Sequence, residues 1–161
     1  MYAKIVDKII WFFERILILF MVAMIVIIGL QVLFRYFLRN PLRWSEQAAR
    51  FLFIWCTFLG VPVVFHGKVS MSFDMLIDMV KGKKRDIISI VIHCIIIALA
   101  LFFFVSGVQL VGRSIGVFTP GVRIPVNALY IAIPISMAAL VLVEIEKIID
   151  EFKKIQEGGR I

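Results

Sequence analysis

Three long runs of apolar residues carry no charge from end to end: residues 16–34, 87–111 and 124–143. A helix needs about 20 such residues to cross the hydrocarbon core of a membrane. A segment in lipid must also satisfy its own backbone polar groups, which a helix does. The pattern therefore predicts three transmembrane helices, over about 12–34, 87–111 and 124–146.

A fourth apolar run, residues 51–65, is too short to cross a membrane by itself. It reaches the required length only if its helix begins near Ser45, as the N-cap, and carries Glu46 and Arg50 in its first turns. Glu46 and Arg50 are four residues apart with the acid first, which is the favourable order for a helical ion pair. We therefore predict a fourth span over about 45–65.

Amphipathic stretches between the spans predict helices that lie in the membrane interface. Within residues 70–81, three methionines share one helical face, and Asp74 and Asp78 lie on another. Asn40 and Pro41 favour a second short interfacial helix between the first two spans. Four basic residues near the third span are expected to contact anionic inner-leaflet lipid: Lys81, Lys83, Lys84 and Arg85.

The composition fits an all-α integral membrane protein with four transmembrane helices. Of the 161 residues, 62% are hydrophobic, and the mean hydropathy is +1.03, whereas average proteins are nearer half apolar. We expect a single membrane domain over residues 1–161. The net charge is +7, but the basic residues flank the spans instead of lining one solvated face. Nucleic acid is therefore not an expected partner.

The distribution of basic residues predicts the orientation of the chain. With the N-terminus inside, 12 basic residues fall in cytoplasmic flanks and 6 fall outside, which favours both termini in the cytoplasm. All nine lysines then lie inside, whereas six of the nine arginines lie outside: Arg35, Arg39, Arg43, Arg50, Arg113 and Arg123. Arginine binds carboxylates through two N–H groups, so these residues favour an acidic protein partner outside the cytoplasm. The alternative is that they reach outer-leaflet phosphates.

Residues that could carry chemistry are scarce. The deep parts of the spans hold no acid or base except His93, and no nucleophile–base pair, phosphate-binding loop or metal-ligand spacing is found. We therefore expect neither an enzyme nor a bound metal or cofactor. One rival is an electron-transfer subunit that holds haem between His66 and His93. Another is a small multidrug-type exporter, but that would need a carboxylate within the membrane, and Glu46 lies too near its edge.

Several short motifs resemble the small (Q-type) membrane subunit of tripartite ATP-independent periplasmic (TRAP) transporters. They cover nearly the whole chain: QVLFRY (31–36), WSE (44–46), Arg50, Trp55, FLG (58–60), Asp74 and FTPGVRIPVNALYIAIP (118–134). In the last motif, Pro125 precedes Tyr130 and Pro134. Two positions depart from the family pattern, since Gln47 replaces a second acid and Ser70 replaces a histidine.

The resemblance implies a subunit of a sodium-driven importer of organic acid anions in a bacterial or archaeal inner membrane. In that family, a periplasmic binding protein captures the substrate and a large membrane subunit moves it, so sodium is expected only in that partner. The small subunit would act as a scaffold for the large one. Residues assigned to large-subunit contact, or to the start of the second span, are Arg35, Trp44, Glu46, Arg50 and Trp55. Those assigned to docking of the periplasmic protein are Arg39, Arg43, Arg113 and Arg123.

Overall fold

The structure is a computed structural model that describes residues 2–37, 43–67, 83–119 and 124–158. Its helices are α1 (Tyr2–Phe37), α2 (Arg43–His66), α4 (Lys83–Arg113), α5 (Val126–Tyr130) and α6 (Ala132–Gly158). The described residues contain no β-strand. They provide four helices long and apolar enough to cross a membrane, with α5 and the first part of α6 sharing the last one. The all-α fold with four spans is therefore confirmed, whereas the expected interfacial helices, over 70–81 and around Asn40, lie outside the described residues.

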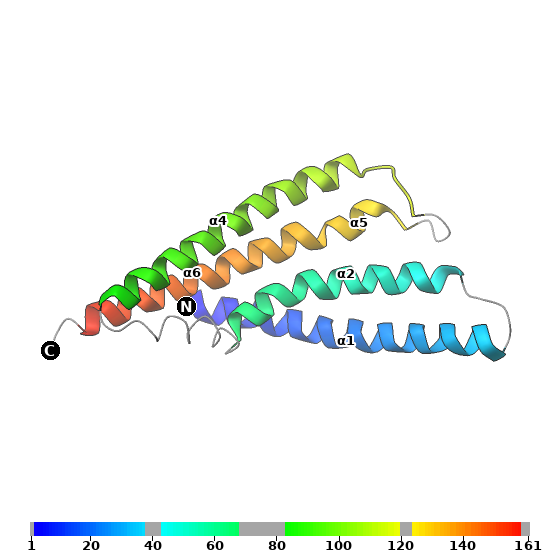
Figure 1. Cartoon of the computed structure of the whole chain (residues 1–161), viewed down its shortest axis with the longest axis horizontal. Helices are drawn as coiled ribbons and strands as arrows, with labels where there is room; N and C mark the ends of the chain where they lie inside the picture. The colour runs from blue at the N-terminus through cyan, green and yellow to red at the C-terminus, as the bar shows by residue number, and fades with distance from the viewer. Residues whose placement is uncertain (1, 38–42, 68–82, 120–123, 159–161) are drawn as a thin grey trace.

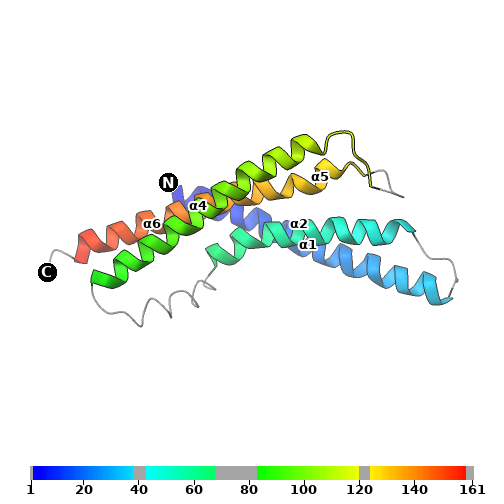
Figure 2. The same cartoon turned by 45° about the horizontal axis from the view of Figure 1, so that its top comes forward.

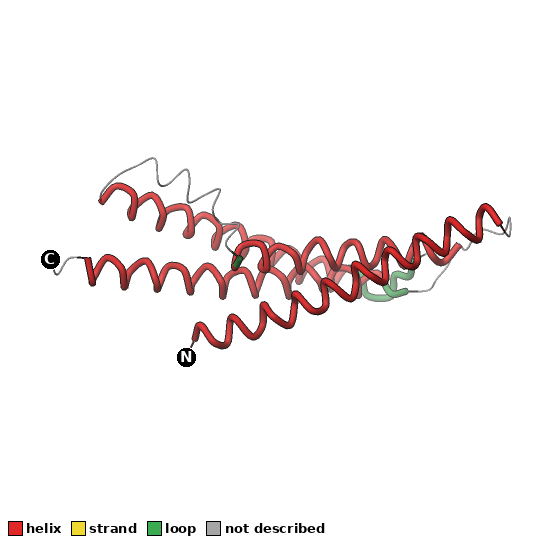
Figure 3. Tube along the Cα trace, turned by 90° about the horizontal axis from the view of Figure 1, so that it is seen from below, coloured by secondary structure: helices red, strands yellow, loops and turns green. Residues whose placement is uncertain are grey.

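The helices form one layer in the order α1, α2, α6, α4 (Figure 1). α1 pairs with α2, α4 pairs with α6, and the contact between α2 and α6 joins the two hairpins. α1 begins and α6 ends at the same end of the molecule, which we call the terminal end; the opposite end is the loop end. The two hairpins lie close together toward the terminal end and diverge at the loop end (Figures 1 and 2). Figure 3 shows that the helices cross at an angle instead of running parallel.

The helices extend beyond the apolar runs that predicted them. α1 has 36 residues, which corresponds to a length of about 54 Å, against a hydrocarbon core of about 30 Å. The added turns contain charged residues, such as Lys4 and Lys8, that hydropathy alone does not assign to a helix. α2 begins at Arg43, two residues earlier than predicted. Ser45 is therefore inside the first turn with a fully buried side chain, and its prediction as N-cap is wrong.

Small buried residues on α6 allow its neighbours to approach closely. Ala132 and Ser136 are fully buried, and Ala139 is 5% exposed, so one stripe of α6 presents little side-chain volume. On α4, Gly107 faces the same helix: a Cβ atom built there would lie 2.9 Å from Cγ2 of Ile133 and 3.1 Å from Cδ of Pro134. The absence of a side chain at Gly107 thus sets the distance between α4 and α6.

Two prolines disturb α2 and the last span, and a side-chain hydrogen bond from a neighbouring helix lies near each disturbance. Pro62 in α2 has no N–H, so the carbonyl of Phe58 loses its helical donor, and the Ser136 hydroxyl donates to that carbonyl. In the last span, the helix is interrupted at Ile131, between α5 and α6. This interruption lies in the turn that precedes Pro134. The Trp55 indole N–H donates to the carbonyl of Ala128, just before this interruption, at 3.1 Å. Backbone groups in lipid need such partners, so the two bonds stabilise the packing of α2 on α6 and on α5.

Candidate functional sites at the two ends of the helices

The start of α2 presents a charged pair at the loop end. The Glu46 Oε1 atom lies 3.1 Å from Nη2 of Arg50, as the four-residue spacing predicts. Both side chains are mostly exposed, at 66% and 58%, and such pairs contribute little to stability. Trp44 beside them is also exposed. This turn therefore displays charged and aromatic groups at the surface instead of supporting the interior.

Trp55, by contrast, is engaged within the chain. Besides its hydrogen bond to Ala128, its ring packs edge-on against Phe20, with centroids 6.3 Å apart, and lies 6.1 Å from the ring of Phe51. It thus connects α1, α2 and α5. The tryptophan assigned to partner contact from the sequence has its polar atom committed to an internal bond.

Four of the six predicted outer arginines are found together at the loop end. Arg35 lies in the last turn of α1, Arg113 lies in the last turn of α4, and both are exposed. Arg43 begins α2, and Arg50 follows two turns later. Arg39 and Arg123 lie outside the described residues. The side chains of Arg35, Arg50 and Arg113, which come from three helices, are exposed, so the loop end carries a basic surface.

A pocket of about 290 Å³ lies at this end, between α2, α5 and the connection before α5. The connection is held by bonds from the Thr119 N–H and hydroxyl to the carbonyl of Ile124, at 2.9 and 3.1 Å. Gln47 and Arg50 provide donors in the pocket, and its apolar walls include Phe51, Ile54 and Leu129. Sequence reasoning missed this pocket, although Gln47 had been singled out as a departure from the family pattern.

The terminal end holds a buried pair of polar side chains that the sequence did not reveal. Nδ1 of His93, in α4, lies 2.5 Å from Oε2 of Glu144, in α6. The Glu144 side chain is fully buried, and its other oxygen lies 3.8 Å from Nζ of Lys147. Sequence reasoning missed this pair because Glu144 directly follows an apolar run and was counted in the flank of its span. The carboxylate has no exposed surface through which a solute would reach it.

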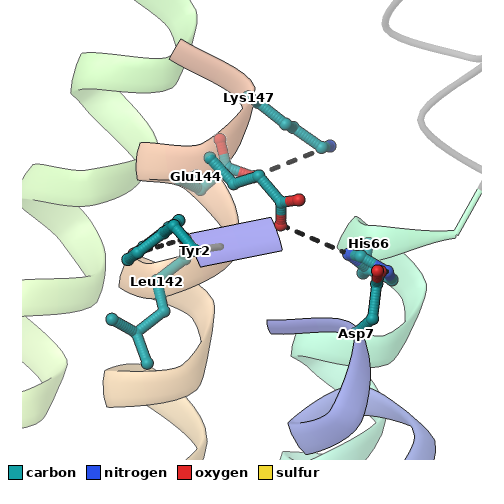
Figure 4. A network of polar contacts seen from close by, with 7 residues as sticks. Tyr2, Asp7, His66, Leu142, Glu144 and Lys147 are labelled. Carbon is teal, nitrogen blue, oxygen red and sulfur yellow. Dashed lines mark hydrogen bonds and ion pairs between the residues drawn. The ribbon is translucent and has the colours of Figure 1, made fainter. Parts of the chain in front are cut away.

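A second cluster at the terminal end joins the remaining helices (Figure 4). Nε2 of His66, in α2, lies 3.1 Å from Oδ1 of Asp7, in α1, and Nδ1 of His66 lies 4.0 Å from Oε2 of Glu146, in α6. The Tyr2 hydroxyl donates to the carbonyl of Leu142 at 3.1 Å. With His93 and Glu144, these contacts bring polar side chains from all four long helices to one end of the layer.

This arrangement does not favour the haem alternative. Both ring nitrogens of His66 lie near carboxylates, and Nδ1 of His93 is bound to Glu144. Within the part of the chain that is described, no group of three His, Cys, Asp or Glu side chains is placed to hold a metal ion. The histidines instead serve contacts between helices.

The predicted lipid-contacting cluster is only partly within the described residues. Lys83, Lys84 and Arg85 form the first turn of α4, at the terminal end, whereas Lys81 lies outside. The basic residues assigned to the inner and outer flanks thus occupy opposite ends of the layer, with one set at the terminal end and Arg35, Arg50 and Arg113 at the loop end.

Comparison with known proteins identifies counterparts that cover most of the chain. The family model of tripartite ATP-independent periplasmic transporters, DctQ component, matches residues 8–154. The chain is 27% identical over 128 residues to the isethionate TRAP transporter permease protein DctMQ of Oleidesulfovibrio alaskensis; the match covers 74% of this chain but spans only 20% of that longer protein. It is also 27% identical over 153 residues to a protein of Haemophilus influenzae described as a TRAP transporter small permease protein, covering 94% of this chain and 90% of the relative.

Proposed function

Because the family model matches most of its length, the chain belongs to the DctQ component family of tripartite ATP-independent periplasmic transporters, and we propose that it is the scaffold subunit of a sodium-driven importer of organic acid anions. Its partners are a large membrane subunit and a periplasmic binding protein. It resides in the inner membrane with both termini in the cytoplasm. The relative named for isethionate transport supports an organic anion as the substrate class.

The single-layer arrangement is the observation that carries the scaffold role. α1 and α4 form the two edges of the layer, and each leaves large apolar side chains exposed, among them Ile25 and Val26 on α1 and Phe102 and Phe103 on α4. A compact bundle would enclose a path for a solute, whereas a layer offers faces on which other helices pack. The relative named DctMQ supports the same view, because its name joins a small component to a larger permease. The chain therefore supports the large subunit, which carries the substrate.

The basic surface at the loop end supports docking of the periplasmic protein. Arg35, Arg50 and Arg113 present guanidinium groups from three helices, and arginine pairs well with the carboxylates of a protein partner. Attraction of this kind acts mainly on the rate of association and weakens with salt. With both termini in the cytoplasm, this end faces the periplasm.

Reconstitution tests the proposal. The tagged chain and the large TRAP permease subunit are coexpressed, purified and placed in proteoliposomes, and uptake of a labelled organic acid is measured with binding protein outside. We expect the two subunits to purify together, and uptake to require both of them, the binding protein and an inward sodium gradient. Ion-coupled transport by the chain alone, or full uptake by the large subunit without it, would contradict the scaffold role.

A further inference from the structure

A groove of about 580 Å³ runs along the first four turns of α1, at the terminal end. Its walls include Ile5, Ile9 and Phe12, and Ile5 and Phe12 are 52% and 56% exposed. The opposite side of the same helix is buried against α2 and α6 through Val6 and Ile10. Phe13 lies at the border: it lines the groove and is itself buried. The groove is therefore an outward-facing apolar surface that no other described helix covers.

Cationic side chains stand at one edge of this groove. Lys4 and Lys8 line it together with Trp11, and their spacing of four and three residues places them on one face of α1. Neither lysine has a carboxylate partner among the described residues. Arg15, one turn further along, lies over the Trp11 ring at 5.2 Å from its centroid, which orients the indole beside the groove. An apolar channel thus has two ammonium groups along one side, neither of them within ion-pair distance of a described carboxylate.

These features match the chemistry of one molecule class, and we propose that the groove binds an anionic phospholipid. The phosphate lies between Lys4 and Lys8, and an acyl chain lies along Ile5, Ile9 and Phe12. Lysine binds phosphate as a compact point charge, and a net negative headgroup is favoured over a zwitterionic one because no described carboxylate neutralises either ammonium group. Trp11 sits between the polar and apolar parts, where tryptophan is favoured in membranes.

A lipid fits this position better than a protein segment does. The groove runs from Lys4 to Phe13, where the predicted span begins, so an acyl chain that follows its apolar wall leads toward the membrane interior while the long lysine side chains reach the headgroups. The charge at its edge is only positive, which complements the one charged group of an anionic lipid. This inference does not depend on the proposed transport function, because it rests on α1 alone.

Tryptophan quenching by brominated lipid tests the proposal on the full chain. The chain is placed in nanodiscs of phosphatidylcholine that contain increasing fractions of either brominated phosphatidylglycerol or brominated phosphatidylcholine. The contribution of Trp11 is taken as the difference in fluorescence between the intact chain and Trp11→Phe. We expect brominated phosphatidylglycerol to quench Trp11 at lower mole fractions than brominated phosphatidylcholine does. The mole fraction that gives half-maximal quenching should be at least about fivefold lower, since each lysine near anionic lipid contributes about that factor.

Matched variants separate the groove from general charge attraction. Lys4→Gln with Lys8→Gln should abolish the preference for the anionic lipid, whereas Lys4→Arg with Lys8→Arg should keep it, and circular dichroism checks that both variants fold. Arg113→Gln removes one exposed charge at the loop end and should leave the quenching of Trp11 by either lipid unchanged. Equal quenching by the two lipids, or a preference that survives the glutamine substitutions, would overturn the proposal. Loss of quenching when the large permease subunit is present would also overturn it, because protein would then fill the groove.

Discussion

Ser136 in α6 donates its hydroxyl proton to the carbonyl of Phe58 in α2, the carbonyl that Pro62 leaves without a helical donor. Both Ser136 and Pro62 are fully buried, so water cannot replace the bond. A structural irregularity in one helix is thereby matched to a polar side chain in the next. This hydrogen bond fixes which residues of α2 and α6 face each other. Apolar packing alone would specify that register less strictly.

Substitution of Ser136 tests this match. Ser136→Ala should destabilise the chain by about 1–2 kcal/mol, because it leaves a buried carbonyl without a donor. In a Pro62→Ala background the same substitution should cost less, since an alanine in place of the proline supplies the missing backbone N–H to the Phe58 carbonyl. Thermal unfolding in detergent, followed by helical circular dichroism, measures both effects. Equal costs in the two backgrounds would refute the compensation.

Gly107 provides a steric test of the α4–α6 interface. Gly107→Ala places a Cβ atom 2.9 Å from Ile133 Cγ2, so the helices must separate, at a cost of about 1–3 kcal/mol. Gly112→Ala is the matched control in the same helix, because nothing lies within 4 Å of its Cβ position. The control should be neutral or slightly stabilising, as expected for alanine in an open helical position. Similar unfolding temperatures for both variants would argue against close packing at Gly107.

The buried pair between His93 and Glu144 predicts strong coupling in a double-mutant cycle. His93→Leu leaves the Glu144 carboxylate buried with only the more distant Lys147, and removal of one partner from a buried pair costs about 3–5 kcal/mol. Adding Glu144→Leu should recover much of that loss, because the uncompensated charge disappears. His66→Leu serves as a control: its nearer partner Asp7 is 62% exposed and Glu146 lies 4.0 Å away, beyond hydrogen-bond distance, so the cost should be about 0–1 kcal/mol. The free energy of unfolding is measured for each variant, and additive effects of the two leucine substitutions would contradict the coupling between His93 and Glu144.

The docking role predicts an effect on uptake that depends on the concentration of binding protein. Arg39→Glu with Arg43→Glu should slow uptake by about tenfold at low binding-protein concentration and low salt, because charge complementarity speeds association. Membrane assembly should be unaffected. Lys153→Glu with Lys154→Glu makes the same change in charge near the other end of the chain and should leave uptake unchanged. Normal uptake in the arginine variant at every concentration of binding protein would show that Arg39 and Arg43 do not contribute to docking.

Local patterns explain why much of the fold could be predicted from the sequence. The four spans follow from apolar runs whose length the membrane fixes, and the Glu46–Arg50 pair follows from spacing within one helix. The helix ends were predicted less well, since the turns that hold Lys4 and Lys8 are helical although they carry charges. The start of α2 was also misplaced: the N-cap was predicted at Ser45, whereas the helix begins two residues earlier, at Arg43.

Contacts between helices could not be predicted from the sequence, because they depend on which helices are neighbours in the fold. His93 and Glu144 are 51 residues apart, and hydropathy places one inside a span and the other past its end. Once α4 and α6 are known to be antiparallel neighbours, both residues fall at the same depth and the pair becomes foreseeable. The Ser136–Phe58 bond has the same origin: the sequence contains Pro62, but only the packing of α6 on α2 supplies the donor.

The position of α6 also determines how the chain must assemble during translation. α6 is the last of the described helices to leave the ribosome, yet it contacts every other one, and α4 packs only on α5 and α6 among them. Before α6 is synthesised, the helices α1, α2 and α4 lack the contacts that join them. Among the described residues, α4 then has no packing partner from its own chain except α5, and the α1–α2 hairpin does not contact α4. The contacts that join the α1–α2 hairpin to α4 therefore form in one late step, when α6 enters between two segments that were inserted before it.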